Sequence, residues 1–166
     1  MGALVEEVRI WNTPIVGAYL LWSFTDGYMT NHRSGDAPIG LLHFIAMAIL
    51  TDIKMIESIR DGKGGLQSFA RGFENKKKYD RLLSIHERVQ SKKEYTLSSI
   101  DVAISQGLLS WDSQTGKIYA HDLTKPTRGN AVRPSIKKYG AKAHILGKWF
   151  SQNDISTISL YLKVNL

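Results

Sequence analysis

Residues 11–28, WNTPIVGAYLLWSFTDGY, limit the fold of this chain more than any other segment. Asn12 or Thr13 can serve as an N-cap, and Pro14 suits the first helical position because its missing N–H needs no partner there. Gly27 supplies a stop signal. Apolar and aromatic side chains lie around the whole circumference of the predicted helix, whereas a surface helix carries one apolar face. The segment therefore predicts a helix that must be covered on every side.

Two interpretations of this helix follow. In the first, the chain's own helices wrap it and it is the centre of the domain. In the second, one stripe packs in the core and a partner subunit closes another stripe. The core-facing stripe would consist of Ile15, Tyr19 and Trp22, with Leu21 and Ala18 beside it. The candidate partner-binding residues are Trp11, Val16, Leu20, Phe24 and Tyr28.

The rest of the chain predicts a mainly α fold with one β-hairpin. Apolar spacing predicts a helix from Pro38 to about Arg60, a short helix over 66–73 and an amphipathic helix within 76–90. Asn153 or Asp154 can cap a short last helix. We expect a single domain over 1–166, with a helical part (1–95), a helix plus hairpin (96–123), a basic linker (124–134) and C-terminal helices (135–166).

Residues 95–123, YTLSSIDVAISQGLLSWDSQTGKIYAHDL, predict a winged helix-turn-helix-like unit. Thr96 can cap a helix, and two β-prone runs joined by the turn DSQTG predict a hairpin that would form the wing. The core face of this helix would consist of Leu97, Ile100, Ile104 and Leu108. A recognition helix needs cations near phosphates, but Thr96–Leu109 carries only Asp101 as a charge. We therefore interpret the unit as a scaffold or docking module rather than a sequence reader.

Positive charge is concentrated in the C-terminal part of the chain. The formal net charge is +7, and no acidic residue lies between Asp122 and Asp154. Such a surface attracts polyanions or acidic protein faces, although it also suits a merely solvated surface. A second cluster comprises Lys76–Lys78 and Arg81. The candidate contacts to nucleic-acid phosphates are Lys125, Arg128, Arg133, Lys137, Lys138 and Lys142.

The sequence predicts no catalytic residues, no cofactor and no metal site. It contains no cysteine, which excludes disulfides and thiolate metal sites. GKGG at 62–65 lacks the spacing of a phosphate-binding loop. His43 lies in an apolar helix and is interpreted as a core histidine. The start of the chain lacks a signal-peptide core and the longest apolar run, 38–50, is too short to span a bilayer, so we expect a cytoplasmic protein without membrane contact.

Several segments together resemble a known family, the middle component of bacterial three-component ABC-ATPase (ABC-3C) systems, which include the Lamassu-type antiphage systems. The resemblance lies in hydrophobic patterns that occur in the expected order. The matching segments are NTPIVGAYLLWSFTDGY, APIGLLHFIAMAIL, AISQGLLSWDSQTGKI, KAHILGKWF and ISTISLYLKV.

This resemblance implies a non-enzymatic adaptor subunit. It would bridge an SMC- or Rad50-like ABC ATPase and an effector, often a nuclease, in a defence complex that senses foreign DNA. The basic stretch from Lys125 to Lys148 is in turn suited to contact DNA phosphates without reading sequence. The alternative from a different class is a winged-helix DNA-binding regulator.

Overall fold

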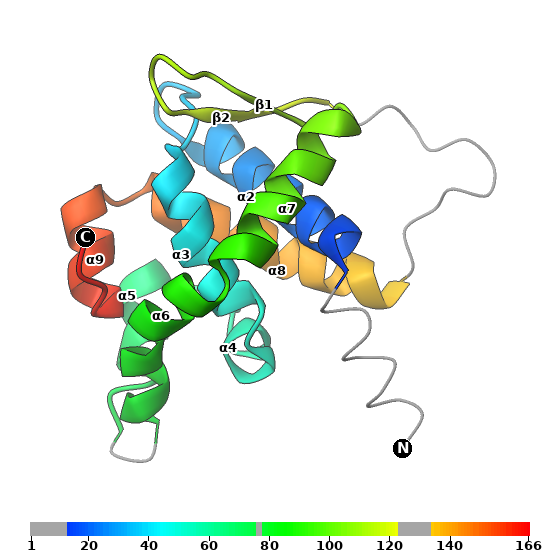
Figure 1. Ribbon diagram of the computed structural model, residues 1–166. Helices are drawn as coiled ribbons and strands as arrows, with labels where there is room; N and C mark the ends of the chain where they lie inside the picture. Colours follow the sequence, from blue (N-terminus) through cyan, green and yellow to red (C-terminus); the bar gives the residue numbers. More distant parts are fainter. Residues whose placement is uncertain (1–12, 76–77, 123–133) are drawn as a thin grey trace.

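A computed structural model of the chain describes residues 13–75, 78–122 and 134–166 (Figure 1). The predicted mainly helical fold with one hairpin is confirmed. The elements, in order, are α2 (Pro14–Asn31), α3 (Gly40–Leu50), α4 (Ile53–Glu57), α5 (Gly65–Arg71), α6 (Tyr79–Ser91), α7 (Lys93–Ser105), β1 (Leu109–Trp111), β2 (Ile118–Ala120), α8 (Pro134–Ser151) and α9 (Ile155–Leu162).

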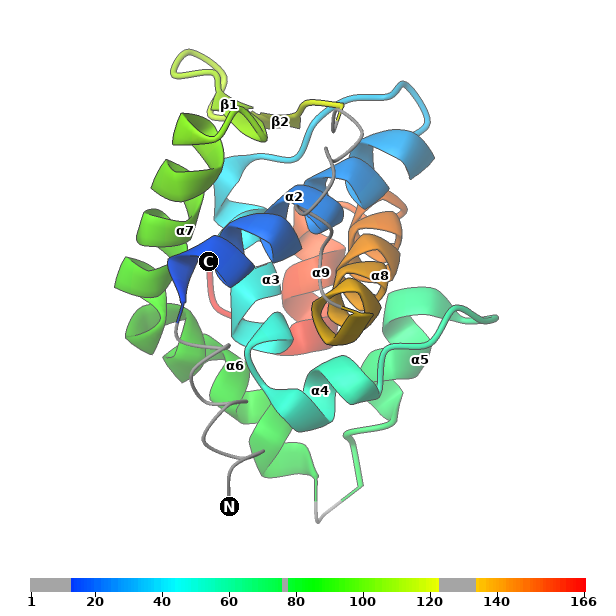
Figure 2. The same cartoon turned by 90° about the vertical axis from the view of Figure 1, so that its right-hand side faces the viewer.

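Helix α2 lies in the middle of the molecule, between α7 on one side and α8 on the other (Figure 2). It begins as predicted, with Thr13 as the extended N-cap and Pro14 at the first position. Its side chains join two apolar clusters, because Leu20 and Phe24 pack in the main core while Ala18 and Leu21 pack with α7 and the hairpin. The interpretation of a helix wrapped by its own chain therefore describes α2.

Two details of α2 differ from the sequence expectations. Ile15, expected in the core-facing stripe, is 61% exposed. Gly27 does not end the helix, which continues to Asn31. Gly27 instead faces the backbone of α8, where an added Cβ would lie 2.1 Å from the carbonyl oxygen of His144. This glycine is a packing residue, and nothing in its sequence neighbourhood distinguishes the two roles.

The contact between α2 and α8 is a close backbone contact. A Cβ on Gly147 would lie 2.0 Å from the carbonyl oxygen of Phe24 and 2.7 Å from the amide nitrogen of Tyr28. Gly140, which lies about two turns before Gly147 on α8, leaves room for the ring of Tyr19. Small residues let two helix backbones approach more closely than side chains normally allow. The pair forms the centre of the main core together with the edge-to-face rings of Phe24 and Phe150.

The single helix predicted from Pro38 to Arg60 is interrupted, and Asp52 marks the interruption. The Asp52 carboxylate accepts hydrogen bonds from the backbone N–H groups of Lys54 and Met55, so it caps α4. The start also differs, because α3 begins at Gly40. The carbonyl of Pro38 accepts the N–H of Ile118, which ties this segment to strand β2.

The buried Asp52 carboxylate also holds α6 in place. Arg81 Nη1 donates to both of its oxygens, at 2.8 and 2.6 Å, and Arg88 Nη1 donates at 2.7 Å. Arg88 further donates to the Ala48 carbonyl and to the Thr51 hydroxyl. Partial burial is the main cause that lowers the pKa of Arg88, and Asp52 opposes it. This cluster fastens α6 to the junction of α3 and α4.

Helix α7 and the hairpin form the predicted helix–hairpin unit. The face of α7 that is buried differs from the predicted core face. The strands pair antiparallel, with Leu109 opposite Ala120 and Trp111 opposite Ile118. The helix begins at Lys93, so Thr96 is buried inside it rather than capping it. Of the predicted core face only Ile100 is fully buried. The winged helix-turn-helix stays a prediction.

The orientation of α7 follows from its packing on α2. A Cβ on Gly17 would lie 2.1 Å from Oγ of Ser99, so Ser99 occupies the space beside Gly17. Ala103 is completely buried on the same side. Because these small residues face α2, Leu97 and Ile104 are turned outward and are 38% and 39% exposed.

The other short helices follow their sequence signals. Helix α5 covers most of the predicted 66–73 segment, and Leu82 and Ile85 form the buried face of α6. Asp154 caps α9 by accepting the N–H of Thr157 at 2.7 Å.

His43 is a core residue, as interpreted from the sequence. Its Nε2 lies 2.8 Å from the Thr25 hydroxyl, and its ring packs edge-on against Phe24. Complete burial lowers the pKa of His43 to about 4, so the imidazole is neutral at neutral pH.

Candidate phosphate-binding groove

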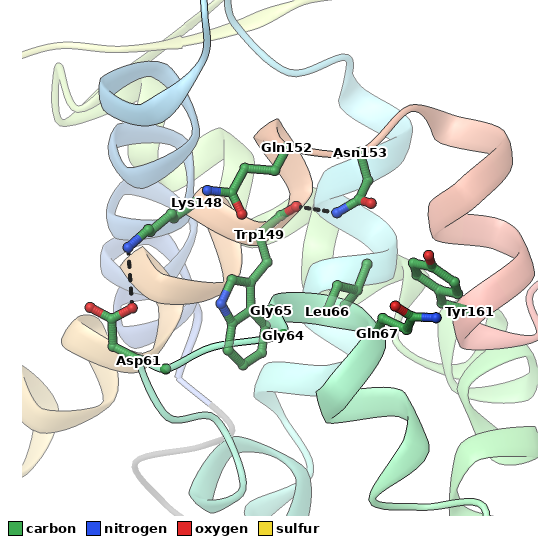
Figure 3. Close-up of a pocket in the computed structure, with 11 residues that line it drawn as sticks. Asp61, Gly64, Gly65, Leu66, Gln67, Lys148, Trp149, Gln152, Asn153 and Tyr161 are labelled. Atoms are coloured by element: carbon green, nitrogen blue, oxygen red, sulfur yellow. Dashed lines mark hydrogen bonds and ion pairs between the residues drawn. The ribbon is translucent and has the colours of Figure 1, made fainter.

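The loop that joins α4 to α5 separates two hollows in the surface, with Trp149 of α8 between them. Gly64 and Gly65 adopt left-handed backbone conformations with φ of 104° and 55°, which favour glycine. On one side lies a pocket of about 340 Å³ (Figure 3). Lys148 and Asp61 form an ion pair of 3.2 Å at one edge of it. The indole of Trp149 lies beside the two glycines.

The other hollow is a basic groove, formed by two adjoining cavities of about 330 and 510 Å³. Both cavities are lined by Ser58, Arg60, Phe73 and Lys78. One acidic residue, Glu57, lies among the residues that line them. The cations of the basic groove are Lys54, Arg60, Lys63, Lys78 and Arg81.

Three parts of the chain position these cations. Lys54 lies in the first turn of α4, which Asp52 caps, and Arg81 lies in the first turn of α6, where Asp52 holds its guanidinium. Lys63 lies in the glycine-rich loop. The capping and clamping by Asp52 therefore build two walls of the basic groove from segments that are far apart in sequence.

The charges of the basic groove are open to an outside ligand. Within the described residues Lys54, Arg60, Lys63 and Lys78 are exposed and form no ion pair. Arg81 already pairs with Asp52 and contributes less. Exposed unpaired cations around a hollow concentrate positive potential and attract phosphate groups.

Helix α8 extends this positive region. Lys142 donates a hydrogen bond to the Ile59 carbonyl, beside Arg60. Its pKa is lowered, first by burial and then by repulsion from Arg60 and Lys138, which outweighs the opposing effect of Glu57. Lys138 and Lys142 thus belong to the same electrostatic region as the basic groove.

The phosphate-contact residues predicted from the sequence fall into three groups. Lys125, Arg128 and Arg133 lie outside the described residues. Lys137 and Lys138 are exposed near the start of α8. Lys142 is half-buried and already bonded to Ile59, so its role is to hold α8 against the α4–α5 loop as well as to add charge.

The predicted second cluster supplies part of the basic groove through Lys78 and Arg81, whereas Lys76 and Lys77 lie outside the described residues. Sequence reasoning missed Lys54, Arg60 and Lys63. The segment IKMIESIRDGKGG carries these three cations together with the two acids Glu57 and Asp61, so its positive excess is small in the sequence.

The predicted partner-binding residues are placed differently from the expectation. Val16, Leu20 and Phe24 are buried in the core of the chain itself. Tyr28 is half-buried and stacks on His32, and burial raises its pKa. Trp11 lies outside the described residues. Val16, Leu20 and Phe24 therefore have a core role, because α7, α8 and the hairpin cover the helix, whereas partner binding by Trp11 and Tyr28 stays a prediction.

Metal-ligating side chains are dispersed in the part of the chain that the structure describes. No three histidine, aspartate or glutamate residues there gather into a potential metal site. None of the described helices has the length and apolar character needed to cross a bilayer.

Comparison with known proteins gives one match. No curated protein and no solved structure is significantly similar to the chain. The family model for the ABC-three component (ABC-3C) system Middle Component 3 matches residues 1–166. The resemblance to the middle components of three-component ABC systems is confirmed at this level. The chain belongs to the ABC-3C system Middle Component 3 family.

Proposed function

We propose that this middle component is a non-catalytic accessory subunit of a cytoplasmic bacterial defence complex. It would bridge an SMC- or Rad50-like ABC ATPase and an effector, a nuclease in the simplest case, that acts on phage or plasmid DNA. The observation that carries the proposal is the family match over residues 1–166. A middle component of a three-component system acts through contacts with the other two components.

The basic groove gives this subunit a second task, which is to hold nucleic-acid phosphates. Within the described residues its exposed lysines and arginine lie on a short helix and loops rather than along one long helix. Phosphate contacts of this kind provide affinity and orientation but carry no sequence information. We therefore propose binding of DNA near the ATPase without sequence preference.

A winged-helix regulator is less well supported than the accessory subunit. Its recognition helix would be α7, whose exposed charged residues are Lys93, Glu94 and Asp101. Two acids and one lysine oppose approach to the phosphates that line a DNA groove. The helix–hairpin unit is better suited to docking a protein.

Complex formation tests the accessory role. We expect the chain, co-expressed with the ATPase and the effector encoded beside it, to elute with both in size-exclusion chromatography. Omitting the chain should separate the ATPase from the effector. A chain that elutes alone in the presence of both partners would overturn the proposal, and an ATPase–effector complex that forms equally well without it would overturn the bridging role.

DNA binding tests the basic groove separately. The double substitution Arg60→Glu with Lys63→Glu should weaken binding to a DNA duplex about tenfold or more in fluorescence anisotropy near 0.1 M salt, because each lost phosphate contact removes counterion release. Wild-type affinity should fall steeply with salt and should not depend on sequence.

The matched control for this charge change is Arg33→Glu with Arg71→Glu, which alters two exposed arginines that do not line the basic groove. Equal losses in both double variants would show that only net charge matters. Undiminished DNA binding by the groove variant would remove the basic groove as the site, and binding of an acidic partner protein in place of DNA would reassign it.

A further inference from the structure

The outer face of α6 and α7 carries a regular pattern that the core and the basic groove do not use. The two helices follow one another in the chain with Lys92 between them. Eight exposed positions form two series with a spacing of seven residues. The acidic series is Asp80, Glu87, Glu94 and Asp101. The other series is Leu83, Gln90, Leu97 and Ile104, and we call the two series together the outer stripe.

The outer stripe points away from the core on both helices. In α7 the opposite side consists of Thr96, Ser99, Ile100 and Ala103, which are buried toward the rest of the molecule. In α6 the buried residues are Leu82 and Ile85. Within a helix, positions three, four and seven residues apart share a face, so the acids and the aliphatic residues of α7 lie side by side.

The aliphatic members of the outer stripe are large apolar side chains that remain exposed. Leu83 is 44% exposed, and Leu97 and Ile104 are nearly as exposed. Helix α7 buries Ile100 together with the small residues Ser99 and Ala103, and it leaves two further large aliphatic side chains, Leu97 and Ile104, on the opposite side. A helix with apolar side chains on two sides is suited to a second apolar neighbour.

The charge of the outer stripe is opposite to that of the whole chain. Its four carboxylates form no ion pair within the described residues, while the chain has a net charge of +7. Among the described residues, Lys93 and the half-buried His86 adjoin it in the sequence as cationic or titratable side chains. A second copy of this chain would oppose acid to acid, and nucleic acid would oppose phosphate to acid.

We propose that the outer stripe, centred on Leu97, Asp101 and Ile104, docks a basic amphipathic helix of a partner subunit. The aliphatic residues would pack against the apolar seam of that helix, and its flanking lysines or arginines would pair with the carboxylates. A seven-residue spacing is the spacing at which two helices pack side by side in a coiled coil. This inference deepens the proposed bridging function, since it assigns one of the partner contacts to a surface.

A synthetic helix tests this surface without the natural partner. The probe is a heptad-repeat peptide with Leu at positions a and d and Lys at e and g, and its counterpart carries Glu at e and g. Wild-type chain should bind the basic peptide in fluorescence anisotropy, with affinity that falls as salt rises, and should bind the acidic peptide at least tenfold more weakly. Equal binding of both peptides, or binding of neither, would overturn the inference.

Two variants locate the binding. Leu97→Ser with Ile104→Ser should lower the affinity for the basic peptide at least tenfold, and circular dichroism should show an unchanged fold because both side chains are exposed. The control is Leu160→Ser on α9, which is 65% exposed and lies outside the outer stripe. An equal loss in the control variant would show non-specific apolar binding and overturn the assignment.

The same variants separate this inference from the proposed function. In the co-expression experiment, Leu97→Ser with Ile104→Ser should release the ATPase or the effector while the wild type retains both. If the wild type and the variant both retain the two partners, the inference is overturned and the proposed function stands. A wild type that binds the basic peptide but neither partner would overturn the proposed function alone.

Discussion

Replacing Gly147 by alanine is expected to destabilise the chain by about 3 kcal/mol, the upper range for overpacking in a well-packed core. Alanine normally favours a helix over glycine by about 1 kcal/mol, so the sign of this effect depends on packing. The added methyl group would meet the backbone of Phe24 and Tyr28, which cannot rotate away as a side chain can. Helices α2 and α8 would have to separate. Urea unfolding followed by circular dichroism measures the change.

Gly62→Ala is the matched control, because a Cβ there has no heavy atom within 4 Å. We expect that variant to unfold within about 0.5 kcal/mol of the wild type, as for an ordinary surface substitution. A Gly147→Ala variant as stable as the control would show that α2 and α8 are not in backbone contact.

Replacing Asp52 by alanine is expected to cost about 2–3 kcal/mol, through the loss of a helix cap and of charged hydrogen bonds to two partly exposed arginines. The carboxylate caps α4, and its removal leaves Arg81 and Arg88 without their shared anion. The part of α6 that carries both arginines would lose its attachment to α3 and α4. Asp52→Asn should cost less than alanine, since asparagine still caps a helix while the charge is lost.

Asp61→Ala is the control for this second change. Its 3.2 Å ion pair with Lys148 is solvent-exposed, and exposed pairs contribute about 0–1 kcal/mol. Thermal unfolding of the three variants at one protein concentration ranks them. Equal stability of Asp52→Ala and Asp61→Ala would refute the role of Asp52 as the anchor of α6.

Local signals identified most elements of the fold. Thr13 and Pro14 mark the start of α2, Asp154 caps α9, and DSQTG turns the hairpin, because each feature depends on residues that are neighbours in sequence. The all-round apolar character of α2 also predicted its burial. Each of these signals depends on hydrogen bonds or backbone angles within a few neighbouring residues.

Features that depend on distant segments could not be predicted. Gly27 was interpreted as a stop because its α8 neighbour lies far along the chain. The outward rotation of Leu97 and Ile104 depends on Gly17 meeting Ser99. The basic groove required Lys54 of α4 and Arg81 of α6 to come together, although the two residues lie on separate helices. Periodicity identifies an apolar face but not which of two neighbouring faces meets the rest of the protein.

The glycine-lined contact of α2 and α8 also joins two segments that lie far apart in the sequence. The position of α8 is set by two backbones that fit against one another. Because backbone meets backbone at Gly27 and Gly147, we expect α2 and α8 to move as one rigid unit.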